Sequence, residues 1–226
     1  MKFIKSKLEN IRNKEKVLID ESSIESQRKL KHIVVIGTST GGPKALRKVI
    51  SSIPSNVEAA FLVVQHMPPK FTKSLAERLD YMSKVKVKEA ESNEIIKVGH
   101  VYIAPGGFHL LVNENSNSLL RIKLSKAPPV NGHRPSVDAL MMSVSQIKLQ
   151  NIIGVIMTGM GRDGSEGVKV LKEIKNAHII AQDESSSIVF GMPKEAISKG
   201  VVDVVASLNE IANEIIKIVG VHKQWM

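Results

Sequence analysis

Apolar and polar residues follow two alternating patterns from residue 32 onward. Short apolar runs predict strands over 32–36, 59–64, 152–158, 178–181 and 201–205. Between them, apolar residues recur at helical spacing and predict helices over 43–52, 70–81, 165–175, 193–199 and 208–219. Strands that alternate with helices form a parallel sheet covered on both faces. The predicted fold class is therefore α/β, with a doubly wound, mostly parallel sheet.

The middle of the chain departs from this alternation. Residues 100–104, 109–112 and 119–124 are strand-like and have no helical segment between them. Turn residues join them, first Pro105-Gly106-Gly107 and then the polar stretch 113–118. Short strands joined by such turns predict an antiparallel hairpin, which we expect at one edge of the sheet.

The first 31 residues have a different pattern. Ile4, Leu8, Ile11 and Leu18 fall near helical spacing among charged residues, and a polar stretch follows over 21–27. We predict two parts: residues 1–31 as a basic amphipathic helix with a linker, and residues 32–226 as one α/β domain. A helix that docks a partner and a frayed surface helix fit the first part equally well.

Composition narrows the classes of function. With no Cys among 226 residues, disulfides, a thiolate nucleophile and Cys-ligated metal sites are excluded. The net charge of +10 favours anionic partners, and a merely solubilising surface explains it equally well. The few aromatic residues are not interleaved with basic ones, which argues against nucleic-acid binding. No apolar run can span a bilayer and no signal peptide is present, so we expect a cytoplasmic protein without membrane insertion.

Candidate chemistry follows three of the predicted strands. In open α/β sheets, ligands bind at the carboxyl ends of the strands. Ser39 follows the first strand, His66 follows the second, and Asp163 lies in the glycine-rich turn after strand 152–158. A Ser, a His and an Asp at one sheet edge are the groups needed for nucleophilic acyl transfer.

Each of these residues also has a simpler explanation. Gly37-Thr38-Ser39-Thr40-Gly41 fits the strand–turn–helix pattern of a nucleophilic serine, but a serine there can also cap the helix. Among the other histidines, His133 in a loop is the serious competitor of His66. Asp163 can cap the following helix. Neither phosphate-loop nor dinucleotide-binding spacing occurs, and no histidine spacing typical of zinc sites occurs, so we expect no metal.

Six segments, in this order, resemble a known family. They are Gly37-Thr38-Ser39-Thr40-Gly41-Gly42-Pro43, Gln65-His66-Met67-Pro68-Pro69-Lys70-Phe71-Thr72, Tyr102-Ile103-Ala104-Pro105-Gly106, His133-Arg134-Pro135-Ser136-Val137-Asp138, Thr158-Gly159-Met160-Gly161-Arg162-Asp163-Gly164 and Val189-Phe190-Gly191-Met192-Pro193. Together they resemble the catalytic domains of CheB-type chemotaxis protein-glutamate methylesterases. The resemblance runs from about His32 to about Ile216.

The resemblance implies a serine hydrolase with a catalytic triad. Ser39 would be the nucleophile, His66 the general base and Asp163 the group that orients His66. Thr40 would help to position the imidazole, and the backbone N–H of Met160 would contribute to an oxyanion hole.

Further implications concern the cleft and its substrate. Loops around Arg134 and Met192 would wall the cleft. The substrates would be glutamyl methyl esters on cytoplasmic helices of methyl-accepting chemotaxis receptors, with methanol released and receptor glutamines also deamidated. The resemblance implies no cofactor, and we expect a monomer.

The chain departs from the family pattern in two places. Thr38 stands where the family often has a smaller residue. The family usually carries an N-terminal phosphoacceptor receiver domain, for which residues 1–31 are too short. Two rival functions are a Rossmann-like nucleotide-binding module and an inactive receptor-binding adaptor; the first gives His66 and Asp163 no role, and the second predicts loss of a triad residue.

Overall fold

The computed structural model describes residues 22, 25–26 and 30–220 of the chain. The helix predicted near the N-terminus and most of its linker lie outside the described residues. The basic amphipathic segment 1–31 therefore remains a prediction.

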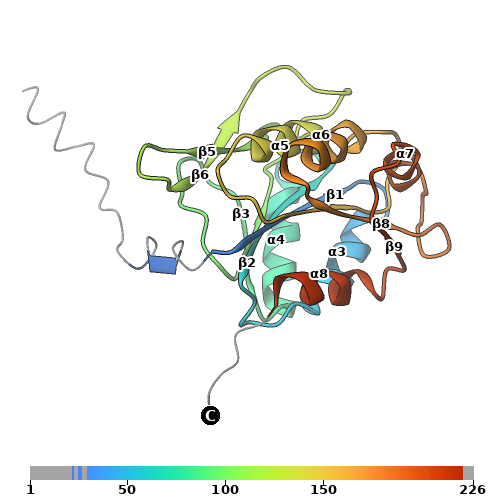
Figure 1. The fold of residues 1–226 in the computed structure, drawn as a ribbon, viewed down its shortest axis with the longest axis horizontal. Coiled ribbons are helices and arrows are strands. Elements are labelled where there is room, and N and C mark those ends of the chain that lie inside the picture. Colours follow the sequence, from blue (N-terminus) through green and yellow to red (C-terminus); the bar gives the residue numbers. More distant parts are fainter. Residues whose placement is uncertain (1–21, 23–24, 27–29, 221–226) are drawn as a thin grey trace, which may run out of the picture.

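Seven parallel strands form the central sheet (Figure 1). In the order in which they pair, they are β3 (Lys86–Glu89), β4 (His100–Ile103), β2 (Ala59–Gln65), β1 (His32–Thr38), β7 (Ile152–Ile156), β8 (His178–Gln182) and β9 (Val204–Ala206). In the middle of the sheet, Ile36 of β1 is in register with Val63 of β2 and Val155 of β7. The ends of β2, β1 and β7 therefore lie next to one another.

Helices cover both faces of this sheet (Figure 1). One face carries α3 (Gly42–Ser51), α4 (Phe71–Met82) and α8 (Ile211–Val219), and the other carries α5 (Val137–Ser145), α6 (Ser165–Lys175) and α7 (Met192–Ser198). Successive residues of β1 alternate between the faces, so Val34 packs with the first group and Val35 with the second. Burial on both faces explains the continuous apolar runs of the strands, and the predicted doubly wound α/β fold is confirmed.

The predicted antiparallel hairpin is also present. It consists of β5 (His109–Glu114) and β6 (Leu120–Ser125), which form a two-stranded sheet of their own. Apolar residues of the hairpin join the core beside α5, and the Val112 N–H donates to Ser143 Oγ at 3.0 Å.

The first strand-like segment of the middle region is placed differently from the prediction. Residues 100–103 form β4, which pairs in parallel with β2 inside the main sheet. The reason is burial on both sides: Val101 packs under the helices of one face, and Tyr102 packs in the core of the other. A strand of the hairpin, by contrast, can leave one side exposed to solvent.

Two elements were absent from the sequence-based prediction. The edge strand β3 buries Val87 between two lysines, an alternation typical of a half-buried strand. Helix α5 buries Val137, Leu140, Met141 and Val144, the i, i+3, i+4, i+7 spacing of an amphipathic helix. The omission of α5 matters because its first turn contributes to the candidate site.

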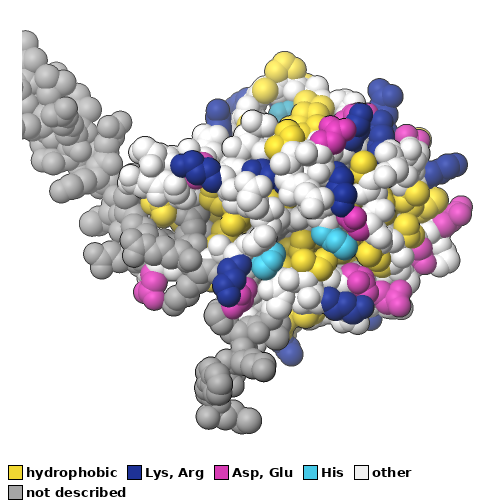
Figure 2. Space-filling model, viewed as in Figure 1, with side chains coloured by type: hydrophobic (Ala, Val, Ile, Leu, Met, Phe, Trp, Pro, Cys, Tyr) yellow, Lys and Arg dark blue, Asp and Glu magenta, His cyan; other side chains and the backbone are white. Residues whose placement is uncertain are grey.

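Charged side chains are dispersed on the face shown in Figure 2, with Lys and Arg among Asp and Glu. This face therefore shows no single basic patch to account for the net charge of +10. None of the helices in the described ranges has the length and apolar character required to traverse a bilayer.

Candidate active site

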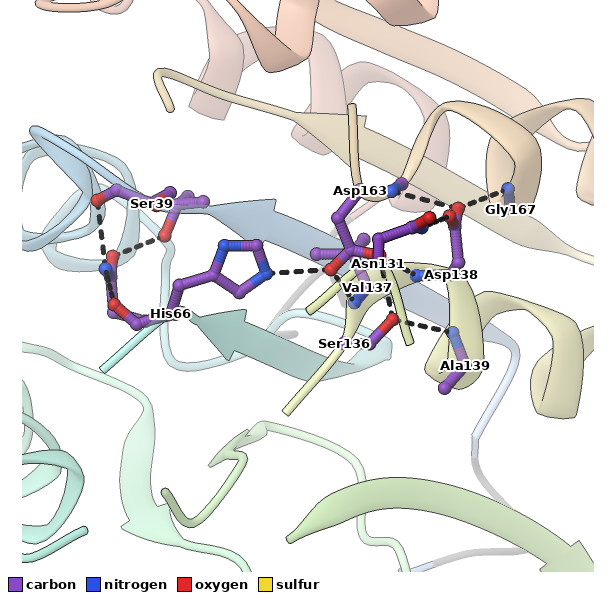
Figure 3. A network of polar contacts seen from close by, with 12 residues as sticks. Ser39, His66, Asn131, Ser136, Val137, Asp138, Ala139, Asp163 and Gly167 are labelled. Atoms are coloured by element: carbon purple, nitrogen blue, oxygen red, sulfur yellow. Dashed lines mark hydrogen bonds and ion pairs between the residues drawn. The ribbon is translucent and has the colours of Figure 1, made fainter. Parts of the chain in front are cut away.

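The loops after three neighbouring strands place Ser39, His66 and Asp163 at one edge of the sheet (Figure 3). Ser39 follows β1 directly, His66 follows β2 directly, and Asp163 lies in the loop between β7 and α6. Because β2, β1 and β7 are adjacent and parallel, these loops meet at one edge. The His66 ring lies between Ser39 and Asp163 in Figure 3.

The turn that carries Ser39 depends on close backbone approaches. The Ser39 N–H donates to Thr158 O at 3.0 Å, and Ser39 O accepts from the Gly42 N–H at 2.9 Å. A Cβ at Gly42 would lie 1.8 Å from Gln65 Oε1, and one at Gly159 would lie 2.8 Å from Ser39 Cβ. These two positions therefore require glycine, and the resulting turn leaves Ser39 partly exposed.

Gln65 joins the loops of the serine and the histidine. This buried side chain accepts from Thr38 Oγ1 at 2.6 Å and donates from Nε2 to Ser39 O at 2.9 Å and His66 O at 3.0 Å. A polar residue at the end of an otherwise apolar strand is the signal that could have identified it. The hydrogen bonds also give the Thr38 hydroxyl a use beyond packing.

The two ring nitrogens of His66 have different environments. Nε2 donates to Asp163 Oδ2 at 2.7 Å. Nδ1 is buried and has no hydrogen-bond partner among the described residues. With its proton on Nε2, the neutral imidazole has the Nδ1 lone pair free to accept another proton.

His133, the competing histidine, stacks on the His66 ring. The ring centroids are 3.8 Å apart and the planes differ by 6°. Burial, reinforced by the charge of His66, lowers the pKa of His133. A neutral ring therefore lies against one face of the His66 imidazole and restricts its rotation.

Asp163 is buried and accepts four hydrogen bonds. Besides His66, the donors are Ser136 Oγ at 2.7 Å and the backbone N–H groups of Val137 and Asp138 at 2.7 and 3.1 Å. Burial raises the pKa of the Asp163 carboxyl, but these hydrogen bonds outweigh burial and hold the pKa below its usual value. Asp163 is therefore a stable anion fixed to the start of α5, and the simpler interpretation as a cap of α6 does not describe its contacts.

Two backbone donors lie near the Ser39 turn. The N–H groups of Thr40 and Met160 donate to no other described residue. Thr40 precedes Gly41, the N-cap of α3, where the helix dipole is positive, and Met160 follows the glycine that touches Ser39. Both N–H groups are candidates for an oxyanion hole. The Thr40 side chain makes no hydrogen bond to His66 in the described structure.

The two residues expected to wall the cleft occupy different places. Arg134 lines a hollow of about 290 Å³ together with His66 and His133, and its guanidinium donates to Lys126 O at 3.0 Å. Met192 is buried at the start of α7, where its sulfur lies against Gly159. Arg134 thus borders the hollow beside the two histidines, and Met192 packs behind the serine turn.

Thr158 attaches the loop before α7 to the serine turn. Its Oγ1 donates to Thr40 O at 2.9 Å and accepts from the N–H groups of Ile188 and Val189 at 3.1 and 3.0 Å. Ile188 is 60% exposed and packs on Gly41, whereas Met160 is 73% exposed. Two exposed apolar side chains therefore lie close to the serine turn.

Comparison with known proteins identifies the family of the chain. The family model described as CheB methylesterase matches residues 34–215, which include Ser39, His66 and Asp163. The chain belongs to the CheB methylesterase family. A solved structure of a relative, the CheB methylesterase catalytic domain of Thermotoga maritima, superposes with a TM-score of 0.80 at 45% identity. The match covers 83% of this chain and 98% of that chain.

Curated relatives from bacteria and archaea are named protein-glutamate methylesterase/protein-glutamine glutaminase. The protein of Geobacillus kaustophilus is 50% identical over 188 residues, which are 83% of this chain and 54% of the relative. The protein of Archaeoglobus fulgidus is 50% identical over 184 residues, which are 81% of this chain and 52% of the relative. The chain thus spans about half the length of the curated CheB relatives that it matches.

A second buried carboxyl in this CheB domain, Asp138 in α5, predicts a pH-dependent stability. Burial, reinforced by the charge of Asp163, raises the pKa of Asp138 from 3.8 to about 6. The folded protein therefore keeps a proton that the unfolded chain releases, and the stability from Asp138 is full below pH 3.8 and is lost as the pH rises to about 6. We expect the free energy of unfolding of the wild type, relative to Asp138→Asn, to fall by up to about 3 kcal/mol over this interval.

Urea unfolding of both proteins at several pH values between 4 and 7 measures this difference. Other carboxyls, such as Asp163, have lowered pKa values and contribute in the opposite direction, but they are common to both proteins. Parallel curves of stability against pH for the two proteins would contradict the prediction.

Proposed function

We propose that the chain is a serine hydrolase that demethylates glutamyl methyl esters on methyl-accepting chemotaxis receptors. The observation that carries the proposal is the hydrogen bond from His66 Nε2 to Asp163, which leaves Nδ1 of the same ring without a partner in the described structure (Figure 3). The His66 N–H donates to Thr38 O at 3.0 Å, which holds this loop against the one that carries Ser39. Membership of the CheB methylesterase family supports the same chemistry. Relatives named as both methylesterase and glutaminase support deamidation of receptor glutamines as a second reaction.

In the proposed mechanism, Ser39 Oγ attacks the ester carbonyl carbon while His66 Nδ1 accepts the serine proton. The negative charge of Asp163 stabilises the imidazolium that forms. The N–H groups of Thr40 and Met160 stabilise the oxyanion of the tetrahedral intermediate. When the intermediate collapses, His66 returns the proton to the departing methoxide and methanol leaves. A water molecule, activated by the same imidazole, then hydrolyses the acyl-serine and releases the glutamyl carboxylate.

The rival interpretations explain less of the geometry. A nucleotide-binding module would use the glycine turn of residues 37–42 and would leave the His66–Asp163 contact without a role. An inactive adaptor would not need a buried carboxylate held by four hydrogen bonds behind a histidine. The hydrolase accounts for both features.

The proposal is tested with methylated receptor and a fluorophosphonate. We expect methanol to be released from receptor that carries radiolabelled methyl esters, and the fluorophosphonate to modify Ser39 and abolish that release. Mass spectrometry of the modified protein locates the adduct. Receptor that keeps its label, or an adduct on another serine, would contradict the proposal.

Exposed apolar residues beside Ser39 predict that a substitution there weakens binding of the receptor but not of a small ester substrate. Ile188 and Met160 are exposed next to the nucleophile, and a receptor helix can bury them whereas a small ester cannot. Partial burial of one such side chain contributes about 1 kcal/mol, or roughly fivefold in KM. We expect Ile188→Ser to raise the KM for methylated receptor by about that factor, with kcat unchanged and with p-nitrophenyl acetate hydrolysis unaffected.

Val205→Ser is the matched control for this prediction. Val205 is similarly exposed, at 52%, but lies on the edge strand β9. An equal change in KM for both variants would show that Ile188 has no specific role in receptor binding.

The remaining predictions also belong to this proposal. We infer that residues 32–226 are the catalytic domain of a cytoplasmic, monomeric enzyme that needs no cofactor. Release of methanol in the presence of a metal chelator, by protein of monomeric mass in solution, tests the cofactor and oligomer predictions together.

A further inference from the structure

Two buried carboxyl groups cap each other's helices behind the triad (Figure 3). Asp163, which precedes α6, accepts from the N–H groups of Val137 and Asp138 in the first turn of α5. Asp138, in that turn, accepts through Oδ1 from the N–H groups of Gly164 and Gly167 at the start of α6, at 2.9 and 2.7 Å. Asp163 thus accepts hydrogen bonds from N–H groups at the start of α5, and Asp138 of α5 accepts hydrogen bonds from N–H groups at the start of α6.

The Asp163 turn depends on this exchange because glycine follows Asp163. Gly164 has φ of +100°, and a Cβ there would lie 2.6 Å from a side-chain carbon of Ile156, so no larger residue fits. Glycine adopts many backbone conformations and does not by itself enforce this one. The bond from the Gly164 N–H to the Asp138 carboxyl holds the peptide group that directly follows Asp163. Asp138 is therefore bonded directly to the peptide group next to the Cα atom from which the Asp163 side chain projects.

We propose that Asp138 is a positioning residue for the hydrolase reaction, holding the Asp163 turn so that Asp163 Oδ2 stays in contact with His66 Nε2. This inference rests on the proposed function. Asp138 makes no contact with His66 or Ser39 within the described structure and acts only through the Asp163–Gly164 turn. It is 1% exposed, and its second oxygen accepts from Asn131 Nδ2 at 2.8 Å.

Charge gives Asp138 a second influence on the triad. Hydrogen bonds keep the pKa of Asp163 low, while burial and the charge of Asp163 raise the pKa of Asp138. The first negative charge of the pair is therefore on Asp163, and Asp138 ionises only as the pH approaches neutrality. Asp163 and His133 are the titratable groups that contact the His66 ring, and an ionised Asp138 adds a charge behind Asp163 that favours the imidazolium.

The test compares Asp138→Ala and Asp138→Asn with wild type. In Asp138→Asn, the amide oxygen can still accept from Gly164 and Gly167, and the exposed Asn131 can turn its own amide to match. The measurement is the rate constant for modification of Ser39 by a fluorophosphonate between pH 5 and 9. The control is Glu166→Gln. Glu166 lies in the first turn of α6, the turn that Asp138 caps, but its side chain is exposed and paired with Lys199.

We expect Asp138→Ala to slow modification about 10- to 100-fold, the cost of a displaced catalytic group. Asp138→Asn should stay within about threefold at its plateau, because its oxygen still caps α6. The acidic side of the curve of rate constant against pH should move to lower pH in Asp138→Asn, because the imidazolium of His66 loses a nearby negative charge. Glu166→Gln should change neither the rate nor the profile.

Three results would overturn the inference: modification of Asp138→Ala at the wild-type rate, an Asp138→Asn variant as slow as Asp138→Ala, or an unshifted acidic side of this curve in Asp138→Asn. If circular dichroism shows that Asp138→Ala is unfolded, the pH dependence of Ser39 modification in Asp138→Asn tests the inference by itself. Failure of the proposed function is seen separately, as wild-type protein that the fluorophosphonate modifies at Ser39 but that releases no methanol from receptor.

Discussion

Ser39→Ala is expected to reduce methanol release from methylated receptor by about 10⁴- to 10⁶-fold, the loss typical of serine hydrolases without their nucleophile. The substitution removes only the hydroxyl. The backbone bonds of Ser39 to Thr158 and Gly42 do not involve the side chain, so the turn should keep its shape. Stability should therefore change little, and the loss should be in kcat. Steady-state kinetics with labelled receptor, together with thermal unfolding, measure both quantities.

Ser52→Ala is the matched control for the nucleophile. Ser52 lies at the opposite end of the helix that Ser39 precedes, and its hydroxyl bonds only to Lys48 O. We expect this variant to keep wild-type turnover and its fluorophosphonate adduct. Near-normal turnover of Ser39→Ala would show that another residue attacks the ester.

Asp163→Asn should lower turnover by about 10⁴-fold and should also destabilise the fold. All four groups that face the Asp163 carboxylate are donors, so the amide NH₂ must face at least one of them. If it faces His66, the proton moves from Nε2 to Nδ1, and the ring can no longer accept the serine proton. If it faces the start of α5 instead, a buried N–H loses its acceptor, at a cost of about 1–3 kcal/mol.

Kinetics and urea unfolding of the same Asp163→Asn preparation separate these two effects. The control is Ser136→Ala, which removes one of the four donors but leaves His66 and both backbone N–H groups in place. We expect that variant to lose at most about tenfold in turnover. Equal losses in the two variants would mean that packing around Asp163, and not its contact with His66, matters for catalysis.

The central fold could be predicted because the inner strands of the sheet are buried on both faces. Continuous apolar runs mark β1, β2, β7 and β8, and amphipathic spacing marks the helices between them. The placement of residues 100–103 could not be predicted in this way. A short apolar strand has the same sequence pattern whether its neighbour is parallel or antiparallel. The pairing of residues 100–103 with β2 depended on packing beneath α4.

The triad could be anticipated because its residues directly follow strands whose ends must share one edge of a parallel sheet. Sequence spacing placed Ser39, His66 and Asp163 there, and the resemblance to the CheB family assigned their expected roles. For Gln65 the sequence offered only a polar residue at the end of an apolar strand. Its role could not be predicted, because two of its three hydrogen bonds reach Thr38 and Ser39, which are 27 and 26 positions away in the chain.

Most strands and helices, and the turn chemistry at Ser39, are local features that the amino-acid sequence predicts without the fold. Periodicity and glycine placement depend on neighbours in the chain, so they can be read from it. Folding is required before His66 presents Nε2 to Asp163, before His133 stacks on the ring, and before Asp138 and Asp163 cap each other's helices. These contacts join residues 25 to 97 positions apart, and their geometry exists only once the sheet has brought the loops together.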